Sequence, residues 1–247
     1  MPIRQFSTID ALMLGHFQGC VSVADILKVG NLGLGAMENL AGECLIIDGK
    51  CFIGQPGGAV VAADAKERLA FATACDFPMA GTLFQAHDAV GMDQVKARAD
   101  EVRMAECGSD NIPCVCRIDG KFSRVRVRSF HEVKAPFKPL LEIAADQVEA
   151  SRDDIEGTLI GFWFPRFISG VNQEGWHFHF ISRDRQSFGG HCLDCSLASG
   201  LIGCRRELSF SVTLPEDEDF GKLPLGGADL SARREAIENE SQKKEED

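Results

Sequence analysis

Residues 175–182 read Gly-Trp-His-Phe-His-Phe-Ile-Ser, and residues 188–197 read Phe-Gly-Gly-His-Cys-Leu-Asp-Cys-Ser-Leu. In the first segment large apolar residues alternate with polar ones, which is typical of a β-strand that buries one face. The polar stretch between the two segments, centred on Arg185, favours a turn. We therefore expect residues 176–182 and 188–197 to pair as an antiparallel hairpin.

Three of the six histidines of the chain lie in this hairpin. Because successive side chains of a strand point to opposite faces, His177 and His179 share one face. A turn centred on Arg185 places His191 opposite His179, on that same face. Three imidazoles in this arrangement can bind one metal ion, and three neutral histidines leave Zn²⁺ with at least one open position. The same pattern occurs in cupin-type iron or manganese sites, so it does not fix the metal.

Outside this hairpin, two Asp-Gly pairs mark further turns. Asp48-Gly49 predicts a hairpin of residues 44–47 and 50–53, and Asp119-Gly120 predicts one of residues 114–118 and 122–130. Residues 157–164 form an apolar run that predicts a buried strand. Capping residues and the spacing of apolar side chains predict helices, which are expected over residues 9–14, from Ser22 toward Gly30, and over 92–104 and 140–150.

These elements indicate an α/β (α+β) fold. We expect a mixed β-sheet in an N-terminal part, residues 1–155, and antiparallel strands with the histidine hairpin in a C-terminal part, residues 156–213. Residues 214–247 form an acidic tail with eleven acidic and five basic residues. The longest apolar stretch, residues 157–165, is far shorter than the ~20 residues that span a bilayer. The N-terminus lacks the features of a secretory signal, so we expect a cytoplasmic protein.

Composition excludes several classes of partner and chemistry. The chain of 247 residues carries a net charge of −11, which argues against nucleic acids and anionic membranes as partners. Tyrosine is absent, so proton transfer must fall to other residues or to water. There are ten cysteines, and the pairs Cys114/Cys116 and Cys192/Cys195 lack the spacing of a complete zinc site. We interpret the cysteines as small buried hydrophobic residues.

A row of arginines occupies one expected strand face. Arg124, Arg126 and Arg128 alternate with two valines, so the three side chains point the same way. We interpret one or two of these arginines as part of a solvated face. The others can bind a small anion, because a guanidinium offers a fork that fits a carboxylate. A cationic strand in an acidic protein is consistent with a small anionic substrate.

Several segments together carry a resemblance to a known family. The chain resembles the α-acetolactate decarboxylase family over nearly its whole length. The segments that match are Gly33-Leu-Gly35, Gly42-Glu43, Asp48-Gly49, residues 117–122, Arg128-Ser129, residues 156–162, residues 177–191, Ala228-Asp229-Leu230 and Ala236-Ile237. The segment at residues 177–191 is the most specific of these.

The resemblance implies a zinc enzyme that converts 2-acetolactate to acetoin and CO₂. It implies that His177, His179 and His191 are the metal ligands, that Glu43 is a further carboxylate at the metal, and that Arg128 is the active-site arginine. A glutamate of the C-terminal tail, which returns to the metal, is a further ligand.

Two positions in this chain fit the tail glutamate, Glu240 and Glu238, and we favour Glu240. The family usually has a threonine where this chain has Ala36. Family members are often dimers, so a homodimer is expected.

Two other functions remain open from the residues alone. One is a cupin-like metal-dependent oxygenase or isomerase, which would bind iron and consume oxygen without forming acetoin. The other is a non-catalytic binding module stabilised by zinc. In such a module the protein would coordinate the metal completely and leave no open position.

Overall fold

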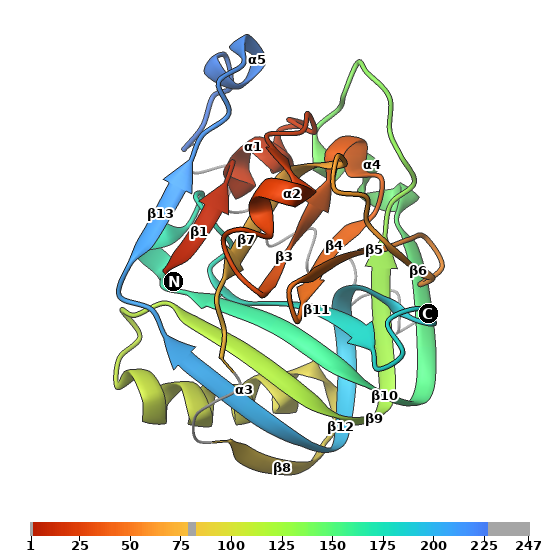
Figure 1. The fold of residues 1–247 in the computed structure, drawn as a ribbon, viewed down its shortest axis with the longest axis vertical. Helices are drawn as coiled ribbons and strands as arrows, with labels where there is room; N and C mark the ends of the chain where they lie inside the picture. The colour runs from red at the N-terminus through yellow and green to blue at the C-terminus, as the bar shows by residue number, and fades with distance from the viewer. Residues whose placement is uncertain (1, 79–82, 227–247) are drawn as a thin grey trace.

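Two β-sheets pack against each other in the computed structural model, which describes residues 2–78 and 83–226 (Figure 1). The first sheet has the strand order β13-β1-β7-β3-β4-β5-β6, with β2 paired to β7. Its strands are β1 (Ile3–Phe6), β2 (Val21–Ser22), β3 (Leu32–Met37), β4 (Glu43–Ile47), β5 (Lys50–Gly54), β6 (Val60–Ala62), β7 (Arg68–Cys75) and β13 (Phe210–Thr213).

The second sheet has the order β11-β10-β9-β12-β8 and carries the histidine hairpin. Its strands are β8 (Phe84–Ala89), β9 (Cys114–Ser129), β10 (Val148–Phe164), β11 (Gly175–Ser182) and β12 (Gly189–Arg206). Because β11 also pairs with β12, the strands β9, β10, β11 and β12 form a closed ring of pairings.

Helices of unequal length lie around the two sheets (Figure 1). The long helix α3 lies across the second sheet, and shorter helices lie around the first. The helices are α1 (Ile9–Met13), α2 (Val23–Ile26), α3 (Gly91–Cys107), α4 (Leu140–Ile143) and α5 (Glu218–Gly221), with 3₁₀ turns at Glu38–Leu40, Ala144–Asp146 and Arg166–Ile168. None of the helices in the described ranges is long and apolar enough to cross a membrane.

The predicted fold class is confirmed. Strands β1 and β13 pair in parallel while the other pairs of the first sheet are antiparallel, so that sheet is mixed. The second sheet is antiparallel throughout. The division into parts 1–155, 156–213 and 214–247 stays a prediction, and residue 156 lies inside β10.

Most of the expected local structure is present. Strands β4 and β5 form the first Asp-Gly hairpin, and α3 covers the helix expected over residues 92–104. Two side-chain caps explain where short helices begin, because Thr8 accepts a hydrogen bond from the Ala11 amide and Ser22 accepts one from the Asp25 amide.

Two local predictions were wrong. Asp119-Gly120 makes no turn, since β9 runs straight through it and pairs with β10 on one side and β12 on the other. The Asp119 carboxylate accepts hydrogen bonds from Arg117 and Thr158 instead of capping a turn. The helix expected over residues 140–150 ends early, because residues 148–150 join β10 and pair with β9.

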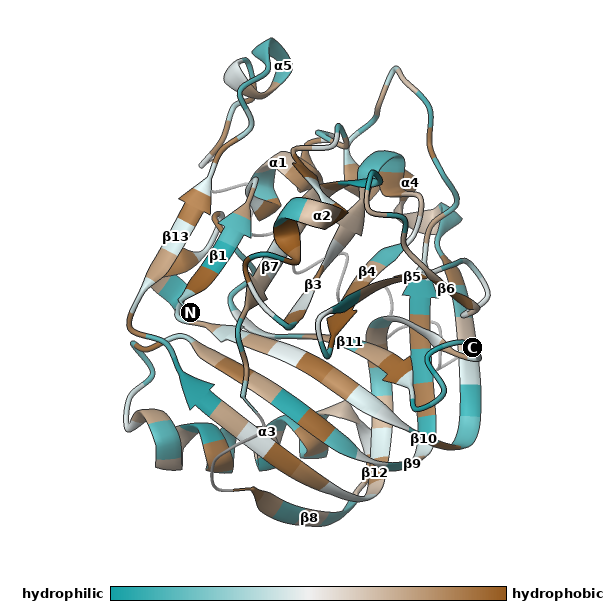
Figure 2. Cartoon of the chain, viewed as in Figure 1, coloured by the Kyte–Doolittle hydropathy of each residue, from teal (hydrophilic) through white to brown (hydrophobic). Residues whose placement is uncertain are grey.

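Apolar side chains between the sheets form the central core. Leu34 and Leu45 of the first sheet meet Ile160, Phe162 and Ile181 of the second, and all are nearly inaccessible to solvent. Figure 2 shows apolar residues alternating with polar ones along β9 and β10, as expected for strands with one buried face. A second core lies between the ring of strands and α3.

The two sheets touch through backbone at one place. A Cβ atom on Gly54, at the end of β5, would lie 2.9 Å from the carbonyl oxygen of Gly189 and 2.9 Å from the Cα of Gly190. The hydroxyl of Ser129 donates a hydrogen bond to the Gly54 carbonyl across the same contact, at 2.8 Å. Gly54 in turn pairs with Glu43 on β4. The contact therefore brings the start of β4 next to the strand that carries His191.

We predict that Gly54→Ala destabilises the protein by about 1–3 kcal/mol, the usual cost of overpacking a well-packed interior. The added methyl meets backbone atoms of β12, which a side-chain rotation cannot move aside. The measurement is the free energy of unfolding from urea denaturation. Gly221→Ala is the matched control, because a Cβ there meets no atom within 4 Å. Equal stability of the two variants would contradict a tight contact between the sheets.

Candidate metal centre

The hairpin of β11 and β12 has the register expected from its sequence. His179 pairs with His191, and Ile181 pairs with Gly189. The turn between the strands is held by Asp184, whose carboxylate accepts hydrogen bonds from Ser182 and from the backbone amide of Ser187. These bonds hold the pKa of Asp184 well below its usual range.

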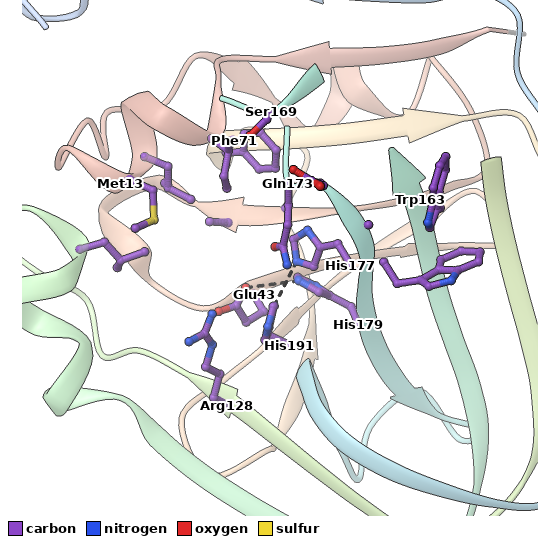
Figure 3. Close-up of a pocket in the computed structure, with 18 of the residues that line it drawn as sticks. Met13, Glu43, Phe71, Arg128, Trp163, Ser169, Gln173, His177, His179 and His191 are labelled. Carbon is purple, nitrogen blue, oxygen red and sulfur yellow. Dashed lines mark hydrogen bonds and ion pairs between the residues drawn. The ribbon is translucent and has the colours of Figure 1, made fainter. Parts of the chain in front are cut away.

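Three imidazoles meet on one face of this hairpin (Figure 3). The ring centroids are 5.0 Å apart for His177 and His179, 4.9 Å for His177 and His191, and 5.2 Å for His179 and His191. One ring nitrogen of each lies within 4.8 Å of the others, close enough for one metal ion to bind all three. The side chain of Phe178 enters the core on the other face.

All three histidines are at most 7% exposed, and burial lowers their pKa values. The pKa of His179 falls to about 3, and those of His177 and His191 fall well below the ordinary value. The rings are therefore neutral at physiological pH, and neutral imidazole is the form that binds metals.

Hydrogen bonds set which nitrogens face the centre. Nδ1 of His179 lies 3.0 Å from the carbonyl oxygen of Cys44, and because a carbonyl only accepts, Nδ1 carries the proton. Nε2 of His179 is then unprotonated, and its lone pair is available on the side of Glu43. Nε2 of His177 lies 3.0 Å from Nδ1 of His191, so these two nitrogens point at the same spot. A backbone acceptor behind a ligand histidine is the usual outer support of a metal site.

The first sheet supplies a carboxylate to the centre. Oε2 of Glu43 lies 3.7 Å from Nε2 of His179. Burial raises the pKa of Glu43 to about 7, although the nearby charge of Arg128 lowers it in part. The site thus combines three neutral nitrogens with one carboxylate, a set of donors that suits a divalent ion such as zinc.

Arg128 enters the same space from β9, where it pairs with His191 on β12 (Figure 3). It is 7% exposed, and its Nη1 donates a hydrogen bond to Oε1 of Gln147 at 3.1 Å. Arg124 is exposed, as the solvated interpretation expects. Arg126 is not solvated, which corrects that interpretation, because it is buried and its Nη1 contacts Oε2 of Glu149 at 2.9 Å.

A cavity of about 660 Å³ opens beside these groups. The histidines, Glu43 and Arg128 all line it, so the structure brings together five of the residues that the sequence singled out. Ala36 also lines it. Apolar side chains form one part of the wall, namely Ile9, Leu12, Met13, Leu40, Phe71, Phe130 and Leu140. Glu238 and Glu240 lie outside the described residues.

Some lining residues were not predicted. Lys96 and Asp100 reach the cavity from α3, and Trp163 and Trp176 reach it from β10 and β11. The two α3 residues are four positions apart and so share a helix face, but nothing in the sequence indicates which element that face meets. Only the packing of α3 on β12 places them here.

The cysteines form no second metal centre in the described parts of the chain. All ten are free, and most are buried. Among residues 2–78 and 83–226, the three histidines are the only group of His, Cys, Asp or Glu whose ligand atoms lie close enough to share an ion.

Comparison with known proteins agrees with this geometry. A family model described as alpha-acetolactate decarboxylase matches residues 3–226. The alpha-acetolactate decarboxylase of Klebsiella aerogenes is 32% identical and covers 96% of this chain and 89% of its own length. The enzyme of that name from Methanosarcina mazei is also 32% identical, over 91% of this chain and 76% of its own.

A solved structure supports the same relationship. The crystal structure of alpha-acetolactate decarboxylase from Bacillus subtilis strain 168 superposes with a TM-score of 0.89 at 26% sequence identity. The match covers 96% of this chain and 98% of the other. The fold, the matched length and the identity to these relatives agree, and the chain belongs to the alpha-acetolactate decarboxylase family.

Proposed function

We propose that this protein decarboxylates 2-acetolactate to acetoin and CO₂ with a zinc ion held by His177, His179, His191 and Glu43. The observation that carries the proposal is the convergence of three neutral imidazoles, a buried carboxylate and Arg128 on one cavity. The family adds the reaction, because the relatives carry that name. A direct test is an acetoin assay on the purified protein together with metal analysis of the same sample.

The chemistry of the substrate explains why such a site is suitable. Loss of CO₂ from a β-keto acid leaves negative charge on oxygen, so the reaction needs a group that stabilises an oxyanion. A bound zinc ion would supply this stabilisation as a Lewis acid, without an organic cofactor. Nitrogen and carboxylate oxygen donors are the usual ligands of zinc, which supports this metal.

Two residues of the chain would act on the carboxylate of the substrate and on the proton that replaces CO₂. The guanidinium fork of Arg128 can orient the carboxylate that leaves as CO₂. An arginine donates protons poorly at neutral pH, because its pKa exceeds ~12. Glu43 would be ionised while it binds the zinc ion, so it could accept a hydrogen bond from the water that returns the proton.

The cavity favours this function over a closed structural site. A binding module stabilised by zinc needs protein ligands on every side of the metal, whereas the histidines here face open space. The oxygenase alternative has no specific observation in its favour. A homodimer and a cytoplasmic location stay predictions of this proposal.

We predict that replacing any of His177, His179 or His191 by alanine removes most of the bound zinc and most of the activity. Each substitution deletes one of three nitrogen ligands and leaves the other two too few to hold the ion. Zinc is measured by atomic spectroscopy after dialysis. His87→Ala, at an exposed position on β8, is the control and retains its zinc. Full zinc in all three variants would contradict the assignment.

We predict that Arg128→Lys lowers kcat by at least about 100-fold, the range for loss of a preorganised electrostatic contact. Lysine keeps the charge but loses the planar fork. Zinc content and the far-ultraviolet circular dichroism spectrum stay unchanged. Arg124→Lys, at an exposed position on the same strand, retains the parent rate. A fully active Arg128→Lys would show that this guanidinium has no role in the reaction.

We predict that deletion of residues 236–247 strongly reduces activity with little loss of stability. The resemblance assigns a metal-binding glutamate to this segment, with Glu240 favoured over Glu238. The single variants Glu240→Gln and Glu238→Gln identify which carboxylate is responsible. An unchanged rate in the truncated protein would mean that the tail plays no part in the reaction.

A further inference from the structure

A lysine of α3 reaches the cavity from the side of β12. The start of α3 is fastened to that strand, because the Gly91 amide donates to Oγ of Ser196 at 2.9 Å and the Met92 amide donates to Oδ1 of Asp194 at 2.7 Å. Val95 lies in the core between the helix and the sheet. The next residue, Lys96, is half-buried and lines the cavity with the histidines and Arg128.

The charge of Lys96 acts on one part of the histidine cluster. Burial lowers the pKa values of His177 and His191 most, Arg128 and the neighbouring histidines lower them further, and Lys96 makes the smallest contribution. For His179, the ring beside Glu43, only Arg128 is a charged contributor of this kind. Lys96 is thus a cation in the cavity that it shares with the histidine cluster.

Two cations line this cavity, Lys96 and Arg128. Within residues 2–78 and 83–226, Lys96 has no hydrogen-bond or ion-pair partner. Arg128 has Gln147 as a hydrogen-bond partner and the carboxylate of Glu43 nearby. Asp100, one turn after Lys96, is occupied by Arg103, whose Nε lies 2.8 Å from Oδ1.

In the described residues, no other carboxylate that lines the cavity forms an ion pair with Lys96. Trp176 donates a further hydrogen bond to Asp100, from Nε1 at 3.0 Å. Glu174 lines the cavity at an exposed position, where water screens its charge. A partly buried ammonium group without a partner favours an anion that enters the cavity, because burial makes an unpaired charge costly.

We propose that Lys96 binds the carboxylate of the substrate in the cavity that it lines together with the histidines and Arg128. The inference rests on the proposed function and adds a second cation to the one supplied by Arg128. The two cations come from different elements, α3 and β9, and both line the cavity. The ammonium group offers three donors on a flexible stem, which suits the capture of a carboxylate.

Calorimetric binding to the zinc-loaded protein tests this role with two probes. One is 2-hydroxy-2-methylpropanoate, a small carboxylate that has no keto group and is not decarboxylated. The other is acetoin, which is neutral. We expect Lys96→Met to weaken binding of the carboxylate by about tenfold or more, as for loss of a hydrogen bond to a charged group. Binding of acetoin and the zinc content stay as in the parent.

The matched control is Arg98→Met on the same helix. Arg98 is exposed and pairs with Glu101, so its loss removes one positive charge from α3 outside the cavity. In steady-state assays Lys96→Met raises KM for 2-acetolactate more than it lowers kcat, and Lys96→Arg recovers part of the loss. If Lys96→Met and Arg98→Met bind the carboxylate equally, the inference is wrong. It is also wrong if the parent protein binds the carboxylate no more tightly than acetoin.

The experiments distinguish failure of the binding role from failure of the proposed decarboxylation. A parent protein that forms no acetoin but binds the carboxylate through Lys96 would refute the decarboxylation and keep the binding role. A parent that forms acetoin with a KM that does not depend on Lys96 would keep the decarboxylation and refute the binding role.

Discussion

The backbone contact between Gly54 and the Gly189-Gly190 pair is the constraint on which the site depends. Glu43 pairs with Gly54, and His191 follows Gly190, so the distance between the two sheets sets the distance between carboxylate and imidazole. A Cβ on Gly190 would also lie 2.8 Å from the carbonyl oxygen of Arg128. Side chains larger than hydrogen at these positions would separate three strands that each contribute one functional group.

A network of charges holds the same two sheets together at the turns of their hairpins. Nη1 of Arg117 on β9 contacts Oδ1 of Asp48, in the β4–β5 turn, at 2.6 Å. Arg185, in the turn of the histidine hairpin, reaches the other oxygen of Asp48 at 3.3 Å. The histidine hairpin is thus held at its turn by the ion pair of Arg185 with Asp48 and at the start of β12 by the glycine contact. Rigid support of this kind keeps metal-binding side chains in position without a metal.

The sequence predicted the centre better than its surroundings. The alternation at residues 176–182 and the turn at Arg185 were enough to place His191 opposite His179, because strand pairing is a local, regular geometry. Asp119-Gly120 does not form the predicted turn, since the same dipeptide can form a turn or continue a strand whose neighbours occupy both edges. The burial of Arg126 and the position of Lys96 depend on Glu149 and on α3, which are distant in the sequence. Contacts of that kind follow from packing, which a strand pattern does not encode.

The absence of tyrosine has a practical meaning in view of where the two tryptophans lie. Trp163 and Trp176 both line the cavity, and the chain has no other indole and no phenol. The two tryptophans therefore dominate the near-ultraviolet fluorescence of the protein at every excitation wavelength, and this emission originates at the walls of the cavity. The guanidinium of Arg103 lies 3.8 Å above the ring of Trp163, and Asp100 accepts a hydrogen bond from Trp176, so both emitters have polar neighbours that respond to changes in local field. The protein thus contains its own optical probe of ligand entry, and rates of binding and release can be followed without a label.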